Sequence, residues 1–72
     1  MATKKYNRIK RVLKQKKKTG KWLAAQLAVD EGTVSRWCRN FQQPSLQTLF
    51  DIAELLEVRP EELLASWEGD ME

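Results

Sequence analysis

The chain has 72 residues, 42% of them hydrophobic and 32% charged, with a formal net charge of +3 at pH 7. This length allows one small domain with a single core and excludes a deep substrate cavity. One cysteine and no histidine exclude an internal disulfide, a zinc site and the commonest general acid or base. We therefore expect no enzyme activity, no metal and no cofactor, and interpret the chain as a folded, cytoplasmic binding module.

The charges are distributed unevenly along the chain. Residues 1–21 carry ten Lys and Arg and no acid, residues 22–40 sum to zero, and residues 41–72 sum to −7. The basic first part favours a polyanionic partner, and a solvated basic helix is the simpler alternative. Because the sequence has neither a signal-peptide core nor a membrane-length apolar run, no membrane partner is expected.

Helical periodicity is found in every segment, and no segment alternates like a half-buried strand. The apolar stripe of the first predicted helix consists of Tyr6, Ile9, Val12 and Leu13. That helix should end near residues 17–18, and Thr19 then suits the N-cap of a second helix. The inward-facing positions of the second helix are Leu23, Ala24, Leu27 and Ala28.

A third helix is predicted after a short turn, with Asp30 as its N-cap. Its apolar stripe consists of Val34, Trp37 and Cys38. Asn40 tolerates the left-handed backbone that ends a helix, and Pro44 prevents continuation.

Ser45 is the predicted cap of a fourth helix, and Pro60 suits the first position of a short fifth helix. The inner face of the fourth helix is predicted to contain Leu46, Leu49, Phe50, Ile52, Ala53 and Leu56. Leu63 and Leu64 should pack on the core, and residues 68–72 form an acidic tail. We therefore expect residues 1–72 to be one domain, with a core spanning about 6–66.

The run LAAQLAVDEGTVSRWCRNFQQPSLQTLFDIAELLEV resembles the phage repressor/Cro family of DNA-binding domains, often called XRE-type. The matching positions are Leu23-Ala24, Leu27, Val29, Val34-Ser35-Arg36-Trp37, Pro44-Ser45-Leu46, Leu49, Ile52-Ala53, Leu56 and Val58. The resemblance implies an all-α, compact five-helix domain with a helix-turn-helix, the lambda-repressor-like fold. It also implies sequence-specific binding of double-stranded DNA by a transcriptional regulator acting as a homodimer.

The same resemblance assigns residues 31–40 to the major groove as the recognition helix. The implied base-contacting residues are Glu31, Gly32, Thr33, Ser35 and Arg36. Arg36 is the strongest of these, since a guanidinium can donate twice to guanine. The implied phosphate-contacting residues are Lys18, Thr19, Gly20, Lys21, Arg39, Asn40, Gln42 and Gln43; the first group surrounds a helix N-terminus, which favours anions.

Two features depart from the family pattern. Ala28 occupies the turn position where glycine is common, and a left-handed alanine costs about 1 kcal/mol. The recognition helix begins with the acidic pair Asp30-Glu31, which favours an alternative function: a protein-interaction module or antitoxin-type component with weak or no DNA specificity. A phage repressor and a restriction-system controller also fit the pattern.

The tryptophans and the cysteine have different expected roles. Trp37 and Cys38 are expected in the core, and Trp22 at its edge. Leu64 and Trp67 are the candidate dimer interface, because aromatic side chains are enriched at interfaces.

Overall fold

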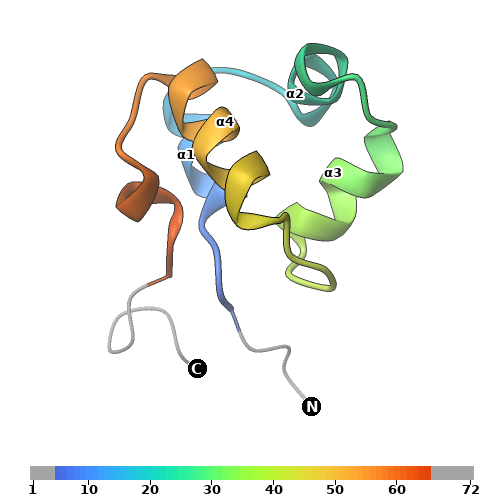
Figure 1. Cartoon of the computed structure of the whole chain (residues 1–72). Coiled ribbons are helices and arrows are strands. Elements are labelled where there is room, and N and C mark those ends of the chain that lie inside the picture. Colours follow the sequence, from blue (N-terminus) through green and yellow to red (C-terminus); the bar gives the residue numbers. More distant parts are fainter. Residues whose placement is uncertain (1–4, 66–72) are drawn as a thin grey trace.

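The computed structural model describes residues 5–65, and this part of the chain is helical (Figure 1). It contains the helices α1 (Ile9–Gln15), α2 (Gly20–Leu27), α3 (Glu31–Cys38) and α4 (Leu46–Leu56), followed by the 3₁₀-helix η1 (Pro60–Leu63). The predicted all-α fold is therefore confirmed, but with four α-helices in the described range instead of five. The fifth element is a single 3₁₀ turn because the chain becomes extended at Leu64, with φ −95° and ψ 142°.

The predicted N-caps are all present. The side chains of Thr19, Asp30 and Ser45 each accept a hydrogen bond from the backbone N–H three residues further on, at 3.0, 2.7 and 3.1 Å. These bonds satisfy N–H groups that have no partner inside the helix, and they determine where α2, α3 and α4 begin.

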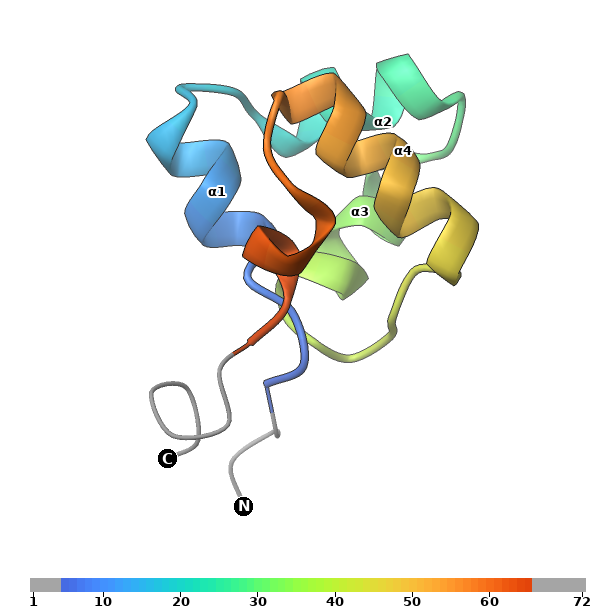
Figure 2. The same ribbon diagram turned by 60° about the vertical axis from the view of Figure 1, so that its left-hand side comes forward.

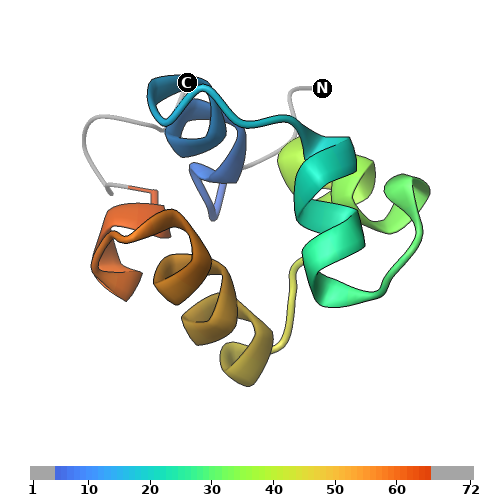
Figure 3. The same cartoon turned by 90° about the horizontal axis from the view of Figure 1, so that it is seen from above.

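Helix α2 ends at Ala28 in the left-handed conformation, with φ 58° and ψ 42°. Ala28 thus adopts the left-handed backbone that glycine commonly provides at this turn position, and it is exposed and not turned inward as predicted. Gly20 at the start of α2 lies close to α3, since a Cβ built there would be 3.4 Å from Cγ1 of Val34. The two helices and their short turn form the helix-turn-helix, which Figure 3 shows on the side away from α4.

Each of the five elements contributes one of the most buried side chains to the core. These are Ile9, Leu23, Val34, Ile52 and Leu63, all 0–1% exposed. Trp37 is also buried as predicted, with its indole N–H unpaired. Fully burying one of these five aliphatic side chains contributes about 1.5–3 kcal/mol to the stability of the fold. The core therefore depends on all five elements together.

Besides Ala28, four residues predicted to face the core are exposed: Tyr6, Leu46, Phe50 and Leu64 have exposed fractions of 54, 71, 54 and 47%. Tyr6 precedes the first residue of α1, so helical spacing does not apply to it. Leu46 and Phe50 lie beyond the strip of α4 that is covered by its neighbours. Leu64 follows η1, whose Leu63 takes the buried position instead.

The two ends of the described chain pair with each other through one antiparallel bridge between Asn7 and Leu64. The backbone N–H of Arg8 donates to the carbonyl of Leu63 at 2.7 Å, and that of Ala65 donates to Tyr6 at 2.9 Å. Figure 2 shows the segments before α1 and after η1 passing side by side. This pairing holds η1 against α1 and completes the core.

Candidate nucleic-acid interface

The outer face of α3 carries four of the five predicted base-contacting residues. Glu31, Gly32, Ser35 and Arg36 are exposed, and Thr33 is half-buried. The helix turns its apolar side, Val34 and Trp37, into the core. The i, i+3, i+4 pattern read from the sequence thus places the polar residues of α3 on one accessible surface.

The guanidinium of Arg36 is held against the surface of α3. Its Nη2 donates to Oγ1 of Thr33 at 3.2 Å, and its Nε donates to Oε1 of Gln42 at 3.1 Å. Nη1 lies 3.4 Å from the position that a Cβ on Gly32 would occupy. Four residues predicted as separate DNA contacts are therefore one cluster, in which the Arg36 guanidinium lies across the helix beside Gly32.

Asn40, predicted to contact phosphate, is strongly engaged within the fold. It has φ 60°, as expected for the residue that ends the third helix. Its Oδ1 accepts hydrogen bonds from the backbone N–H groups of Tyr6 and Asn7 at 2.8 and 3.0 Å. The side-chain amide of Gln43 also donates to this oxygen, at 3.3 Å. Asn40 thus joins the end of α3 to the segment before α1.

Asn7 completes this connection, and no prediction from the sequence included it. It is 5% exposed, and its Nδ2 donates to the carbonyl of Trp37 at 3.0 Å and to Oε1 of Gln43 at 2.7 Å. Its Oδ1 accepts from the backbone N–H of Ile9 at 3.0 Å. An asparagine side chain often accepts a hydrogen bond from the backbone N–H two residues further on. Its position two residues before α1 was therefore the signal in the sequence from which its role could have been predicted.

The predicted phosphate-contacting residues at the start of α2 lie together at one edge of the helix-turn-helix. Thr19 and Lys21 are exposed, and Gly20 is half-buried. The ammonium of Lys18 lies 4.9 Å from the ring centroid of Trp22, which packs half-buried against the core. A tryptophan at the core edge thus positions a cation beside the positive end of the α2 dipole.

At the other end of α3, the Arg39 guanidinium lies 4.7 Å from the ring centroid of Phe41. Arg39, Gln42 and Gln43 are all exposed. Arg39 and Gln42 therefore lie on the surface at the end of α3 and in the loop that follows.

Two titratable groups of α3 have shifted pKa values. Hydrogen bonds from Thr33, and more weakly the charge of Arg36, hold the pKa of the Asp30 carboxyl below its usual 3.8. Burial raises the pKa of the Cys38 thiol. Asp30 is thus a charged cap at neutral pH, and Cys38 is a poor nucleophile.

Within residues 5–65, no group of three or more Cys, Asp or Glu residues is arranged to hold a metal ion. In the same range, no helix has the length and apolar character needed to cross a bilayer.

Comparison with known proteins agrees with this geometry. The model of the Cro/C1-type helix-turn-helix DNA-binding domain family matches residues 8–66. A crystal structure of a protein from Bacteroides fragilis, whose DNA-binding role is a provisional assignment, shares 52% sequence identity with a TM-score of 0.83. The match covers 83% of this chain and 97% of that chain. None of the proteins with curated functions matches the sequence.

Proposed function

Because this chain belongs to the Cro/C1-type helix-turn-helix family of DNA-binding domains, we propose that it is a transcriptional regulator that binds specific sequences in double-stranded DNA. In this proposal α3 enters the major groove with its outer face toward the bases. The observation that carries the proposal is the cluster of Arg36 with Thr33 and Gln42 on that face.

The restraint on Arg36 favours sequence reading over general attraction to DNA. A free arginine loses rotamer entropy when it binds, and a guanidinium already held by two hydrogen bonds loses less. Its two contacts engage Nε and Nη2, and the guanidinium has further N–H donors. A bidentate contact with guanine would contribute roughly 1–3 kcal/mol of discrimination.

The remaining polar residues fit supporting roles. Thr19, Gly20 and Lys21 would contact phosphate at the start of α2, and Arg39 and Gln42 at the end of α3. For Asn40 and Gln43, the proposed role is to hold this loop in place, since both bind Asn7 and each other. Glu31 and Ser35 would face the bases beside Arg36.

The proposal includes a homodimer, since a single recognition helix reads only a few base pairs. Two copies would place their α3 helices in half-sites about 34–36 Å apart. Leu64, half of the predicted interface, is exposed on the surface, and Trp67 lies outside the described residues. Sedimentation of the wild type and of the Leu64→Ala/Trp67→Ala variant tests this, and we expect a dimer for the wild type and a monomer for the variant. A wild type that is monomeric at all concentrations, with and without DNA, would refute the homodimer.

The DNA proposal is tested by selecting duplexes from a random pool and then titrating the best duplex with salt. We expect an enriched sequence and a steep decrease of log affinity with log salt. Arg36→Ala should reduce discrimination at one base position by about ten- to a hundred-fold. Arg59→Ala is the matched control, because this exposed arginine lies beyond α4, where it pairs with Glu61 at 4.0 Å.

No enriched sequence and no duplex binding at low salt would refute the DNA proposal. The second candidate is then the protein-interaction module, which one observation favours: Leu46 and Phe50 are exposed one turn apart on α4. Under that function, Phe50→Ser would abolish partner binding and Arg36→Ala would leave it unchanged.

A further inference from the structure

A groove runs along the surface between α1 and α3. It consists of two adjoining hollows of about 700 and 450 Å³, and both hollows are lined by Lys10, Lys14, Cys38 and Arg39. One hollow extends to Lys5 and Asn40 at the end of α3, and the other extends to Gly20 at the start of α2. The groove therefore connects the two regions where phosphate contacts are already proposed.

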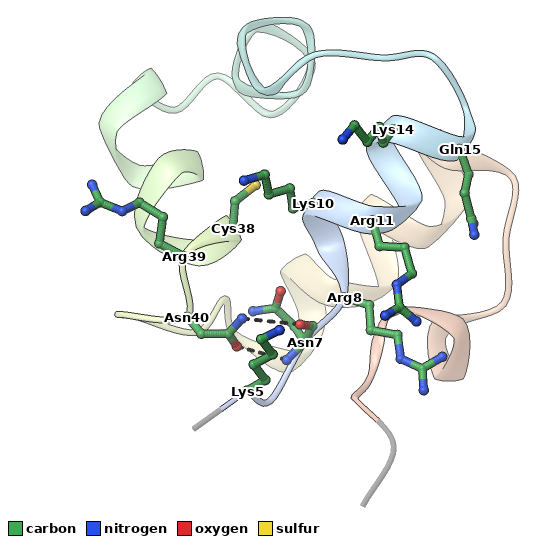
Figure 4. A pocket seen from close by; sticks show the side chains of 10 residues that line it. All are labelled: Lys5, Asn7, Arg8, Lys10, Arg11, Lys14, Gln15, Cys38, Arg39 and Asn40. Carbon is green, nitrogen blue, oxygen red and sulfur yellow. Dashed lines mark hydrogen bonds between the residues drawn. The ribbon is translucent and has the colours of Figure 1, made fainter. Parts of the chain in front are cut away.

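Two lysines of α1 project into this groove. Figure 4 shows the side chains of Lys10 and Lys14 extending from α1 toward α3, with the ammonium of Lys10 beside the sulfur of Cys38. Arg8, which precedes α1, and Arg11 also line the hollow that reaches Lys5, but their side chains extend away from α3 (Figure 4). The orientation of Lys10 and Lys14 thus differs from that of the neighbouring basic residues.

The charge of the groove is nearly all of one sign. The cationic residues of the hollow nearer α2 are Lys10, Lys14, Lys18, Lys21 and Arg39. Glu31 is the acidic residue of its described lining. Clustered cations on low-dielectric walls create a positive potential that attracts a polyanion. The alternative from the sequence is a basic helix whose lysines only contact solvent. That alternative does not account for cationic side chains gathered along one hollow between two helices.

We propose that this groove holds a phosphodiester strand of the bound duplex, so that α1 contacts the DNA backbone through Lys10 and Lys14. The inference rests on the proposed function and adds to it a third backbone contact. The strand would pass from the N-terminus of α2 along α1 to Arg39. The domain would then grip one side of its half-site along an extended stretch of backbone.

The first test compares two double variants with the same net charge. Lys10→Gln/Lys14→Gln removes both groove lysines and keeps good helix formers. Lys16→Gln/Lys17→Gln is the control, because these exposed lysines follow α1 and do not line either hollow. Circular dichroism and thermal unfolding verify that each variant is folded.

Each lost phosphate contact reduces the slope of log affinity against log salt by about 0.9, which corresponds to roughly five-fold weaker binding at 0.15 M salt relative to 1 M. We expect the groove variant to bind roughly 25-fold more weakly, with a slope reduced by about 1.8. An equal loss in the control variant would overturn the proposal, because the lysines would then act through their general field. An unchanged slope in the groove variant would also overturn it.

The second test uses Cys38 as a probe, since it is the chain's single cysteine and lines both hollows. Its alkylation by iodoacetamide at pH 8.5 should slow at least ten-fold when duplex is bound. Fluorescence anisotropy of a labelled duplex in the same wild-type sample reports separately on binding. If the duplex is bound but Cys38 stays as reactive as in the free protein, the groove proposal fails while the DNA proposal stands.

Discussion

The buried amide of Asn7 should be among the most important polar groups for stability. Replacing it with alanine leaves the N–H of Ile9 without its buried partner, whereas the carbonyl of Trp37 loses one of two donors and still accepts from the backbone N–H of Asn40 at 3.0 Å. A buried group left unsatisfied costs about 1–3 kcal/mol, so we expect Asn7→Ala to lower the free energy of unfolding by about 1–3 kcal/mol. A domain of this size has only about 4–10 kcal/mol in total.

Urea denaturation and thermal unfolding measure this loss. The midpoint temperature should decrease by roughly 4–24 °C, at about 4–8 °C per kcal/mol for a domain of this length. Gln26→Ala is the matched control, because it removes an exposed amide and should change stability by less than about 0.5 kcal/mol. If Asn7→Ala is as stable as this control, the network joining α3 to the first segment does not stabilise the fold.

Two further predictions concern the ends of α2 and α3. Ala28→Gly should raise the free energy of unfolding by about 0.5–1 kcal/mol, because the residue has φ 58°, whereas Ala25→Gly inside α2 should lower it by about 1 kcal/mol; urea titration distinguishes the two signs. The lowered pKa of Asp30 means that its stabilisation is complete above the unfolded value of about 3.8 and is lost as pH falls through the lower folded pKa. Denaturation between pH 6 and 2 should therefore show a smaller pH dependence in Asp30→Asn, and an equal dependence would contradict the assigned cause.

Much of the fold could be predicted because its signals are local. Thr19, Asp30 and Ser45 have side chains whose oxygens reach an N–H three residues away, so sequence alone indicates where the helices begin. The width of a buried face is different, because it depends on which elements cover it. Phe50 shares the apolar side of α4 in the sequence, but the neighbouring elements leave it exposed.

The candidate site shows the same limit. The polar face of α3 follows from helical periodicity, and the family resemblance indicated its role. The engagement of Asn40 by Asn7 could not be predicted, because the two residues are 33 positions apart and meet only in the folded chain. Likewise, the sequence does not show which way each basic side chain before position 22 points. In the structure the side chain of Lys10 extends toward α3, whereas that of Arg8 extends away from it (Figure 4).

The pairing of the segment before α1 with the segment after η1 has a mechanical consequence. Its bonds join residues nearly the whole described chain apart, from Tyr6 to Ala65, so the chain forms an almost closed ring. A pull applied through the two ends would load this pairing directly, before any helix bears force. Force applied through the two ends would therefore break this pairing first. Leu63 would become exposed while the helix-turn-helix is still intact.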